Sequence, residues 1–276
     1  MSFIDRLASI GGGVVKVSFI ERKPKRFLAK ILLSHPPTKN ALSGKMMVEL
    51  SKAISEVYER KDEVSLVEVV GDGDFFCSGA DLTVARDIDG YSMCSFMQET
   101  TTRLRDLPCI SVSVIRGGAY GGGTELATAT DHRVFANDAV WRCVHSHMGI
   151  SPGWGGGVRL FRLVGRSKAL QILSGLKLTA QECATFGIAD LVTAPNQDPE
   201  VAALNFFETH FDIYPKALAA CKKSVIAAEI YGDNDKAMKL ELDAFTQVWG
   251  GEDNIEALNR SLKALQSKHN HKVQPA

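Results

Sequence analysis

Hydrophobic residues recur at two different spacings along the first two thirds of the chain. In some segments they alternate or form short apolar runs, as in β-strands, and in others they recur every three to four residues, as on one face of a helix. We therefore expect strands at residues 14–20, 27–33, 65–70, 110–115, 133–136, 140–144 and 188–192, the first two as a hairpin. The pattern predicts helices at residues 44–60, capped by Ser43, 91–107, 122–130, 155–164 and 167–174, and one from Thr179 to near Gly187.

Beyond Asp198 the pattern becomes helical almost throughout. Pro215 is placed to open one helix, and Gly250-Gly251 to separate the last two. Strands alternating with helices, followed by helices alone, indicate an α/β core with a helical C-terminal extension. We place the junction near Pro195-Asn196, which divides the chain into a core, residues 1–195, and a helical region, residues 196–276.

Charge balance and cysteine usage narrow the class of protein. The chain has 276 residues with 32 Lys plus Arg and 32 Asp plus Glu, which argues against a surface tuned as a whole to nucleic acid or to an anionic membrane. Six cysteines stand at irregular spacing without a C-x-x-C pair, as in a reducing compartment without a disulfide framework. No segment approaches the roughly 20 apolar residues of a membrane span, and the N-terminus does not resemble a secretory signal. We expect a cytoplasmic protein.

Two glycine-bracketed turns carry the strongest chemical signal. Residues 77–82 (CSGADL) follow an apolar pair, and residues 117–126 (GGAYGGGTEL) follow the strand expected at 110–115. Glycine permits positive φ angles and close approach of a ligand to the backbone, and each turn lies where a strand ends and a helix can begin. We expect the N–H groups of Ala80 and Gly122 to converge on one oxygen that becomes negative, in an enolate or a tetrahedral oxyanion.

Two other interpretations of these turns are open. Each could be a tight strand-to-helix turn required only for packing, an explanation that suits one such turn better than two. A nucleotide phosphate loop is disfavoured because no G-x-G-x-x-G opens a βαβ unit and no G-x-x-x-x-G-K-[ST] occurs. The glycine-rich stretch at residues 153–157 follows Pro152 and lacks the lysine of such a loop.

Several segments together resemble the crotonase superfamily, also called enoyl-CoA hydratase/isomerase. They are residues 37–42 (PTKNAL), 76–82 (FCSGADL), 117–126, Asp131, 148–156 (MGISPGWGG), 173–175 (LSG) and 187–190 (GIAD). The resemblance implies an α/β fold, a ClpP-like spiral of ββα units with a helical C-terminal subdomain for trimerisation or as a lid. It also implies a homotrimer or a dimer of trimers, and acyl-CoA substrates that bring coenzyme A with them, without a separate cofactor or metal.

The resemblance also assigns residues to the substrate. It implies that the two turn N–H groups hold the thioester oxygen, and that the loop at 39–42 and the turn at 78–82 line the coenzyme A site. The residues expected to contact the substrate are Lys39, Ala41, Leu42, Ser78, Asp81, Leu82 and Trp154. Lys222 and Lys223 would meet the phosphates of coenzyme A or lie on a solvated helix face, and the sequence favours neither.

One position departs from the hydratase pattern. Hydratases of the superfamily use two glutamates as acid and base; the first falls on Glu125, but His145 occupies the second position. Adding water across a double bond requires two groups that position and deprotonate the water, so plain hydratase activity is in doubt. Residues 144–156 and 248–257 instead resemble a branch of the superfamily that decarboxylates ethylmalonyl-CoA and methylmalonyl-CoA.

Loss of CO₂ from such a substrate would give the residues around the turns distinct roles. A neutral or cationic group facing the substrate carboxylate avoids the repulsion that a second glutamate would cause. His145 is expected to orient that carboxylate or to protonate the enolate, and Glu125 to polarise the site or deliver the proton. Trp154 would wall the acyl pocket. The alternatives are purely structural roles: His145 as a hydrogen-bonded core histidine, Glu125 as a carboxylate at a helix N-terminus, and Trp154 as a packed indole.

Other functions stay open on the sequence alone. Glu125 as a single carboxylate would suit a hydratase or a Δ3-Δ2 enoyl-CoA isomerase of fatty-acid metabolism. The scaffold could also belong to a catalytically weak binding protein, one that touches RNA, although balanced charge and intact turns count against this. Cys143, His145 and His147 would face one way in a strand, which is a weak basis for a metal site. Cys77 has no local base and is expected in the core.

Overall fold

A sheet of six strands forms the base of the larger part of the molecule. The computed structural model describes residues 2–24, 26–211 and 214–271. The strands follow one another across the sheet in the order β1 (Val14–Lys23), β2 (Arg26–Ser34), β3 (Val64–Gly71), β4 (Ile110–Ile115), β6 (His132–Phe135) and β9 (Leu191–Val192). β1 and β2 form the predicted antiparallel hairpin, and the other neighbours are parallel. Parallel strands are covered on both faces, which agrees with the burial of β3 and β4 along almost their whole length.

A second sheet of three short strands follows the second glycine turn. β5 (Gly118–Tyr120) pairs in parallel with β7 (Val140–Arg142), and β7 pairs antiparallel with β8 (Lys177–Thr179). The hydrophobic pattern predicts β7 but not β5 or β8, because three residues are too few to show an alternation.

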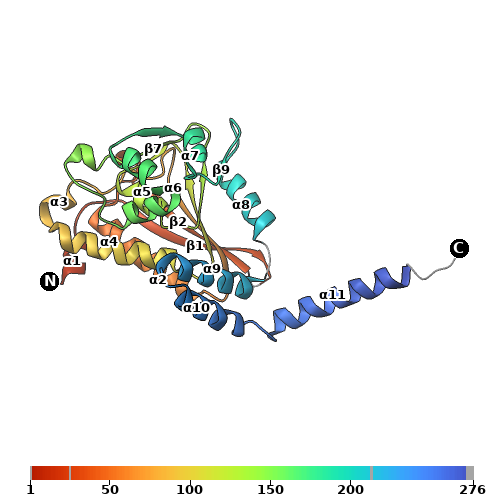
Figure 1. The fold of residues 1–276 in the computed structure, drawn as a ribbon. Coiled ribbons are helices and arrows are strands. Elements are labelled where there is room, and N and C mark those ends of the chain that lie inside the picture. Colours follow the sequence, from red (N-terminus) through yellow and green to blue (C-terminus); the bar gives the residue numbers. More distant parts are fainter. Residues whose placement is uncertain (1, 25, 212–213, 272–276) are drawn as a thin grey trace. The chain divides into compact units, whose positions relative to one another are not determined.

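Helices connect the strands (Figure 1). Up to residue 211 they are α1 (Phe3–Ala8), α2 (Gly44–Glu59), α3 (Val84–Asp87), α4 (Gly90–Arg105), α5 (Gly122–Ala127), α6 (Gly156–Leu173), α7 (Ala180–Phe186) and α8 (Pro199–His210), with 3-10 turns η1 (Pro36–Thr38) and η2 (Ser146–Met148). Ser43 caps α2 by accepting the N–H of Met46 at 3.2 Å, as predicted. Thr179 opens α7, which ends at Gly187 with a φ of 84°, also as predicted.

The structure confirms one pair of predicted helices and adds a helix that the pattern does not show. The helices expected at residues 155–164 and 167–174 are the two halves of α6, which is interrupted by a kink at Gly165 (φ 76°, ψ 169°). The pattern does not show α1 because the helix has only six residues; it is stabilised at its start by a capping box between Ser2 and Asp5.

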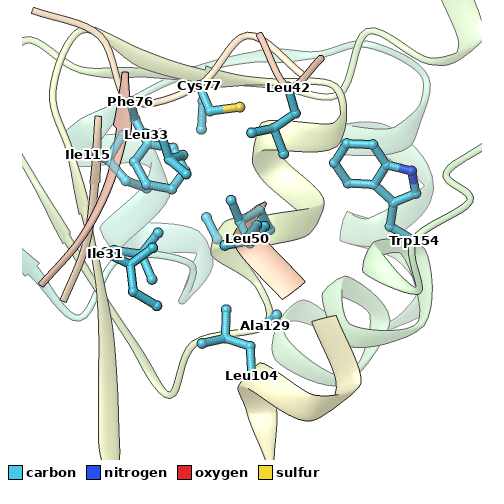
Figure 2. Close-up of a cluster of buried hydrophobic side chains, with 14 of the residues drawn as sticks. Ile31, Leu33, Leu42, Leu50, Phe76, Cys77, Leu104, Ile115, Ala129 and Trp154 are labelled. Carbon is cyan, nitrogen blue, oxygen red and sulfur yellow. The ribbon is translucent and has the colours of Figure 1, made fainter. Parts of the chain in front are cut away.

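The hydrophobic core lies between the six-stranded sheet and the helices packed on it. Figure 2 shows Ile31, Leu33 and Ile115 of the sheet on one side of the cluster, with Leu50 of α2 in the middle and Trp154 on the other side. Leu50 is fully buried, and truncating such a leucine to alanine typically costs about 2–5 kcal/mol. Trp154 is buried in the same cluster, and this packing fixes the loop that carries it.

The chain groups into two compact units that divide between residues 212 and 213. The sequence predicts this junction at residues 195/196. The later division in the structure places α8 in the first unit rather than in the C-terminal one. The second unit contains α9 (Pro215–Ile230), α10 (Asn234–Thr246) and α11 (Glu252–His271), and α9 packs against α10. No helix within the described ranges has the length and apolar character needed to cross a membrane.

A group of charges explains why α8 stays with the sheet. Arg116, just after β4, pairs with Asp198 at 2.6 Å and with Glu200 at 2.5 Å, and Lys30 of β2 also pairs with Glu200. Glu68 of β3 is buried nearby, and burial, followed by the charge of Glu200, raises its pKa to about 7. These partners are distant in sequence, so the composition around the expected junction does not reveal them.

Candidate active site

The two glycine turns meet through a short parallel pairing. Cys77 pairs with Ala119 as an isolated β-bridge, in which the N–H of Tyr120 donates to the carbonyl of Cys77 at 2.9 Å. Gly79 then takes a φ of 109°, and a Cβ at this position would lie 3.0 Å from the nitrogen of Gly122. Glycine is required there both by the φ angle and by the close approach, and it allows the two turns to touch.

The N–H groups of Ala80 and Gly122 are left without acceptors. The carbonyl of Gly79 and the N–H of Asp81 both bond to Leu42, at 2.8 and 2.9 Å, so the Ala80 N–H points to the opposite side of its strand. Gly122 is the first residue of α5, where an N–H has no partner within the helix. No acceptor for either group occurs among the residues that the structure describes. Two such donors in one cavity can stabilise an oxyanion.

Both donors line a single cavity of about 480 Å³. Much of its wall is apolar and comes from Leu82, Met93, Val144, Met148, Ile150 and Trp154. Of these, Leu82, Met148 and Ile150 are largely exposed and form the rim, whereas Trp154 is buried at the inner end. An apolar cavity with a few converging polar groups is typical of a small-molecule site.

Glu125, in the first turn of α5, is held by four hydrogen-bond contacts. Its Oε2 accepts the N–H groups of Trp154 at 2.7 Å and Gly156 at 2.9 Å. Its Oε1 accepts the N–H of Gly153 at 3.2 Å and lies 3.1 Å from Nε2 of His145. The side chain is 3% exposed. An ionised carboxylate has about four lone-pair sites, so every acceptor position of Glu125 is in use.

The surroundings of His145 favour its protonated form. Burial lowers its pKa, but the neighbouring sulfur of Cys143 and the carboxylate of Glu125 outweigh burial and raise the pKa to about 9. Of these two contacts, the one with Glu125 has hydrogen-bond geometry, whereas the buried Nδ1 has no hydrogen-bond partner among the described residues. We therefore attribute the raised pKa of His145 mainly to the carboxylate of Glu125.

A buried arginine fixes the loop that holds Glu125. Arg159 of α6 donates to the carbonyl oxygens of Glu125 at 2.9 Å and Trp154 at 3.0 Å, and its Nε donates to the hydroxyl of Thr128 at 3.2 Å. The guanidinium thus ties α5 and the 153–156 loop to α6.

Trp154 lies directly against one of the oxyanion donors. A Cβ at Gly122 would come within 2.5 Å of two carbons of the indole ring, so Gly122 provides the space for the ring. The indole Nε1 donates to the sulfur of Met93 at 3.3 Å, and the Trp154 carbonyl accepts the hydroxyl of Thr101 at 2.8 Å. Trp154 is thus held through its ring and through its backbone, and the ring closes the inner end of the cavity.

The structure brings together most of the residues that the sequence assigned to the site. The residues that line the cavity are Ala41, Ser78, Ala80, Asp81, Leu82, Gly122, Glu125, His145 and Trp154. Leu42 and Lys39 do not line it: Leu42 is fully buried in the core, and Lys39 is exposed with its Nζ 5.3 Å from the ring centre of Phe75. Lys222 is buried and Lys223 exposed, both on α9 of the second unit.

The remaining hypotheses about cysteines and metals have simple outcomes. Cys77 is fully buried, and burial raises its pKa to about 12, so it is a core thiol as expected. Cys143 lies 3.4 Å from the hydroxyl of Thr124, and His147 lies against Gly175. Within the described parts of the chain, no group of three or more His, Cys, Asp or Glu is arranged to hold a metal. Asp131 accepts the backbone N–H of Ser111 at 2.7 Å, which is a structural role.

Sequence reasoning missed the wall that α4 contributes. Met93 and Cys94 line the cavity but belong to no motif, and only the packing of α4 against the 153–154 loop brings them there. The helical pattern expected at residues 91–107 located the helix without showing which face meets the site.

Comparison with known proteins agrees with this geometry. The enoyl-CoA hydratase/isomerase family model matches residues 24–270. The chain is 38% identical over 262 residues to the ethylmalonyl-CoA decarboxylase of Danio rerio, covering 92% of this chain and 85% of that protein. It is 36% identical over 264 residues to the ethylmalonyl-CoA decarboxylase of Xenopus tropicalis, covering 94% and 87%.

Solved structures show the same fold. An enoyl-CoA hydratase from Bacillus anthracis superposes with a TM-score of 0.80 at 27% identity, covering 90% of this chain and 96% of that one. A putative enoyl-CoA hydratase from Thermobifida fusca, solved in complex with acetoacetyl-CoA, has a TM-score of 0.74 at 24% identity, covering 88% and 96%.

Proposed function

Because the chain belongs to the enoyl-CoA hydratase/isomerase family, we propose that it is an acyl-CoA decarboxylase that acts on ethylmalonyl-CoA and methylmalonyl-CoA. The observation that carries this proposal is the buried pair of Glu125 and His145 beside two free N–H donors. The activity is also the one named for the relatives from Danio rerio and Xenopus tropicalis.

The two N–H donors supply what the reaction needs most. The substrate thioester oxygen would lie between the N–H groups of Ala80 and Gly122. When the bond from C2 to the carboxylate breaks, CO₂ leaves and its bonding electrons form the enolate, whose negative oxygen the two N–H groups stabilise. Removing one such donor typically costs about 2.7–4 kcal/mol in the barrier. The thioester itself accepts the electrons, so the proposed reaction requires no cofactor apart from the coenzyme A of the substrate.

His145 suits a substrate that carries a carboxylate. With a pKa of about 9, its imidazole is positively charged at neutral pH. Glutamates at both positions 125 and 145 would repel a negatively charged substrate. The pair formed by His145 and Glu125 has no net charge. Because Nε2 contacts Glu125 and Nδ1 is buried, we propose that His145 acts on the substrate carboxylate through its charge.

The state of Glu125 argues against hydration. A hydratase glutamate must accept a hydrogen bond from the attacking water, yet all acceptor positions of Glu125 are occupied by three backbone N–H groups and His145. The same occupancy argues against Glu125 as the proton carrier of a double-bond isomerase. We therefore assign Glu125 the role of holding the loop and the histidine.

The setting of the enzyme is also part of the proposal. From the family resemblance we propose a homotrimer or a dimer of trimers, a cytoplasmic location and a place in fatty-acid metabolism, where the enzyme would remove side products of carboxylation. Six free thiols support a reducing compartment. Exposed apolar side chains on the second unit, Trp249 at 65% and Val225 at 68%, support contact with other subunits.

One experiment tests the proposed activity. The protein is incubated separately with ethylmalonyl-CoA, methylmalonyl-CoA and crotonyl-CoA, and CO₂ release and hydration are followed. We expect CO₂ from the first two and no rapid hydration of the third. Rapid hydration of crotonyl-CoA without any decarboxylation would rule the proposal out.

A further inference from the structure

Loss of CO₂ leaves an enolate whose C2 carbon must receive a proton. We propose that Cys94 is the acid that protonates this carbon, an inference that rests on the proposed decarboxylation. The thiol stands in the wall of the same cavity as the Ala80 and Gly122 N–H groups, on α4.

The hydroxyl groups deep in the cavity are already committed to other acceptors. The hydroxyl of Ser78 donates to the carbonyl of Thr38 at 2.7 Å, and the hydroxyl of Thr38 donates to the carbonyl of His35 at 3.1 Å. The remaining wall hydroxyl, that of Ser151, lies on the exposed part of the loop.

The side-chain nitrogen donors of the wall are either bonded or buried. Nε2 of His145 contacts Glu125, and the indole of Trp154 donates to the sulfur of Met93. Nδ1 of His145 is buried and has no hydrogen-bond partner among the described residues. A thiol is a far stronger acid than a serine hydroxyl, which favours Cys94 over Ser151 as the remaining donor.

Cys94 is placed near the reacting end of the cavity. A Cβ at Gly153 would lie 2.4 Å from the Cys94 sulfur, so the thiol rests against the backbone of Gly153. The next residue, Trp154, packs its ring on Gly122. The thiol and one oxyanion donor therefore contact adjacent residues of the loop that Glu125 holds.

The thiol keeps its proton until the enolate forms. Partial burial, followed by the charge of Glu125, raises the pKa of Cys94, so the group is a thiol at neutral pH. In the proposed step the S–H bond breaks and its electrons stay on sulfur. The proton bonds to C2 with the electrons of the enolate double bond, and the thioester carbonyl reforms. The thiolate then regains a proton from water, which restores the enzyme.

The test separates protonation from decarboxylation by running the reaction in D₂O. The wild-type protein and the variant Cys94→Ser convert methylmalonyl-CoA, and both the rate of CO₂ release and the configuration of deuterium at C2 of the product are measured. A positioned general acid typically contributes about 10²–10⁴-fold, so we expect kcat to fall by about 100-fold in Cys94→Ser. Water then reaches the enolate from either face, so the deuterium of the remaining product appears in both configurations, whereas the wild type gives one.

Controls make each outcome decisive. Cys221→Ser, at an exposed position of α9, has the same chemical change and is expected to match the wild type. A Cys94→Ser variant with the wild-type rate and a single configuration overturns the proposal, as does loss of stereospecificity in Ser151→Ala alone. A wild-type protein that releases no CO₂ would instead refute the proposed activity itself.

Discussion

Oε1 of Glu125 lies 3.1 Å from Nε2 of His145, and both side chains are almost completely buried. The remaining acceptor positions of the carboxylate are filled by the backbone of the 153–156 loop. The carboxylate therefore fixes the loop and the charge of the histidine at the same time. Several consequences of this arrangement can be measured.

The charge of His145 should set the alkaline limit of activity. Its pKa is raised from 6.5 to about 9, so the imidazolium is lost as the pH rises through about 9, and kcat/KM for decarboxylation should fall there. Because the folded-state pKa is raised, its contribution to stability is full below about pH 6.5 and declines until about pH 9. The measurements are a pH–rate profile and denaturant unfolding at several pH values. His145→Gln should lack this limb, while His147→Gln should keep it; an unchanged profile in His145→Gln would contradict the assignment.

Glu125→Gln should weaken both the loop and the histidine charge. The NH₂ group of the new glutamine side chain would face backbone N–H donors and could not accept their hydrogen bonds. Hydrogen bonds to a charged group are worth about 1.5–3 kcal/mol, so we expect the free energy of unfolding to fall by about 2–3 kcal/mol. The pKa of His145 should fall toward 6.5, as followed by NMR titration of its ring protons. Glu182→Gln, in an exposed capping box, serves as the control and should lose less stability. A His145 pKa that stays near 9 in Glu125→Gln would show that Glu125 is not its cause.

Gly79→Ala should damage the oxyanion hole without unfolding the protein. The new Cβ would stand 3.0 Å from the nitrogen of Gly122 and displace that donor, so kcat should fall by about 10²–10³-fold. Gly73→Ala is the matched control, because Gly73 also has a positive φ, 69°, but no atom within 4 Å of a Cβ. Both variants carry backbone strain, and only the first should lose activity in a steady-state assay. Equal losses in the two would attribute the effect to strain alone.

Trp154→Phe should relax the selection of acyl chains. The smaller ring leaves space beside Gly122, and one methylene in an apolar pocket is worth about 1–3 kcal/mol in kcat/KM. We expect propylmalonyl-CoA to gain about tenfold relative to ethylmalonyl-CoA. Trp141→Phe, which changes a fully buried indole of β7, should lower stability and leave this ratio unaltered. The idea fails if the ratio is the same in both variants.

The sequence reveals the parts of the site that depend on local backbone chemistry. The positive φ angles of Gly79 and Gly121, the strand β4 before the second turn and the helix caps follow from φ preferences and periodicity, and the structure contains them. The strand expected directly before the first turn is absent: β3 ends at Gly71, and Cys77 forms only an isolated bridge to Ala119. The sequence does not reveal the contacts made between distant segments. Three examples are the contact of Cys94 with Gly153, the hydrogen bond from Arg159 to the carbonyl of Glu125, and the ion pairs that keep α8 on the sheet. The local hydrophobic pattern predicts none of them.

Lys39 and Leu42 show the same limit within a single loop. Both lie in the segment that resembles the coenzyme A site, yet Leu42 points into the core and Lys39 lies over Phe75. A motif identifies the segment, and only the packing of its neighbours decides which side chains meet the cavity.

The two N–H groups of the oxyanion hole also determine how ligands stabilise the folded protein. A ligand of the native state raises the free energy of unfolding by RT ln(1 + [L]/Kd), so every hydrogen bond that the ligand gains acts through Kd. An acyl thioester gives both N–H groups a carbonyl acceptor, and each such hydrogen bond is worth about 0.5–1.5 kcal/mol. At equal concentration, an acyl thioester should therefore raise the melting temperature more than a matched thioether of coenzyme A that lacks the carbonyl.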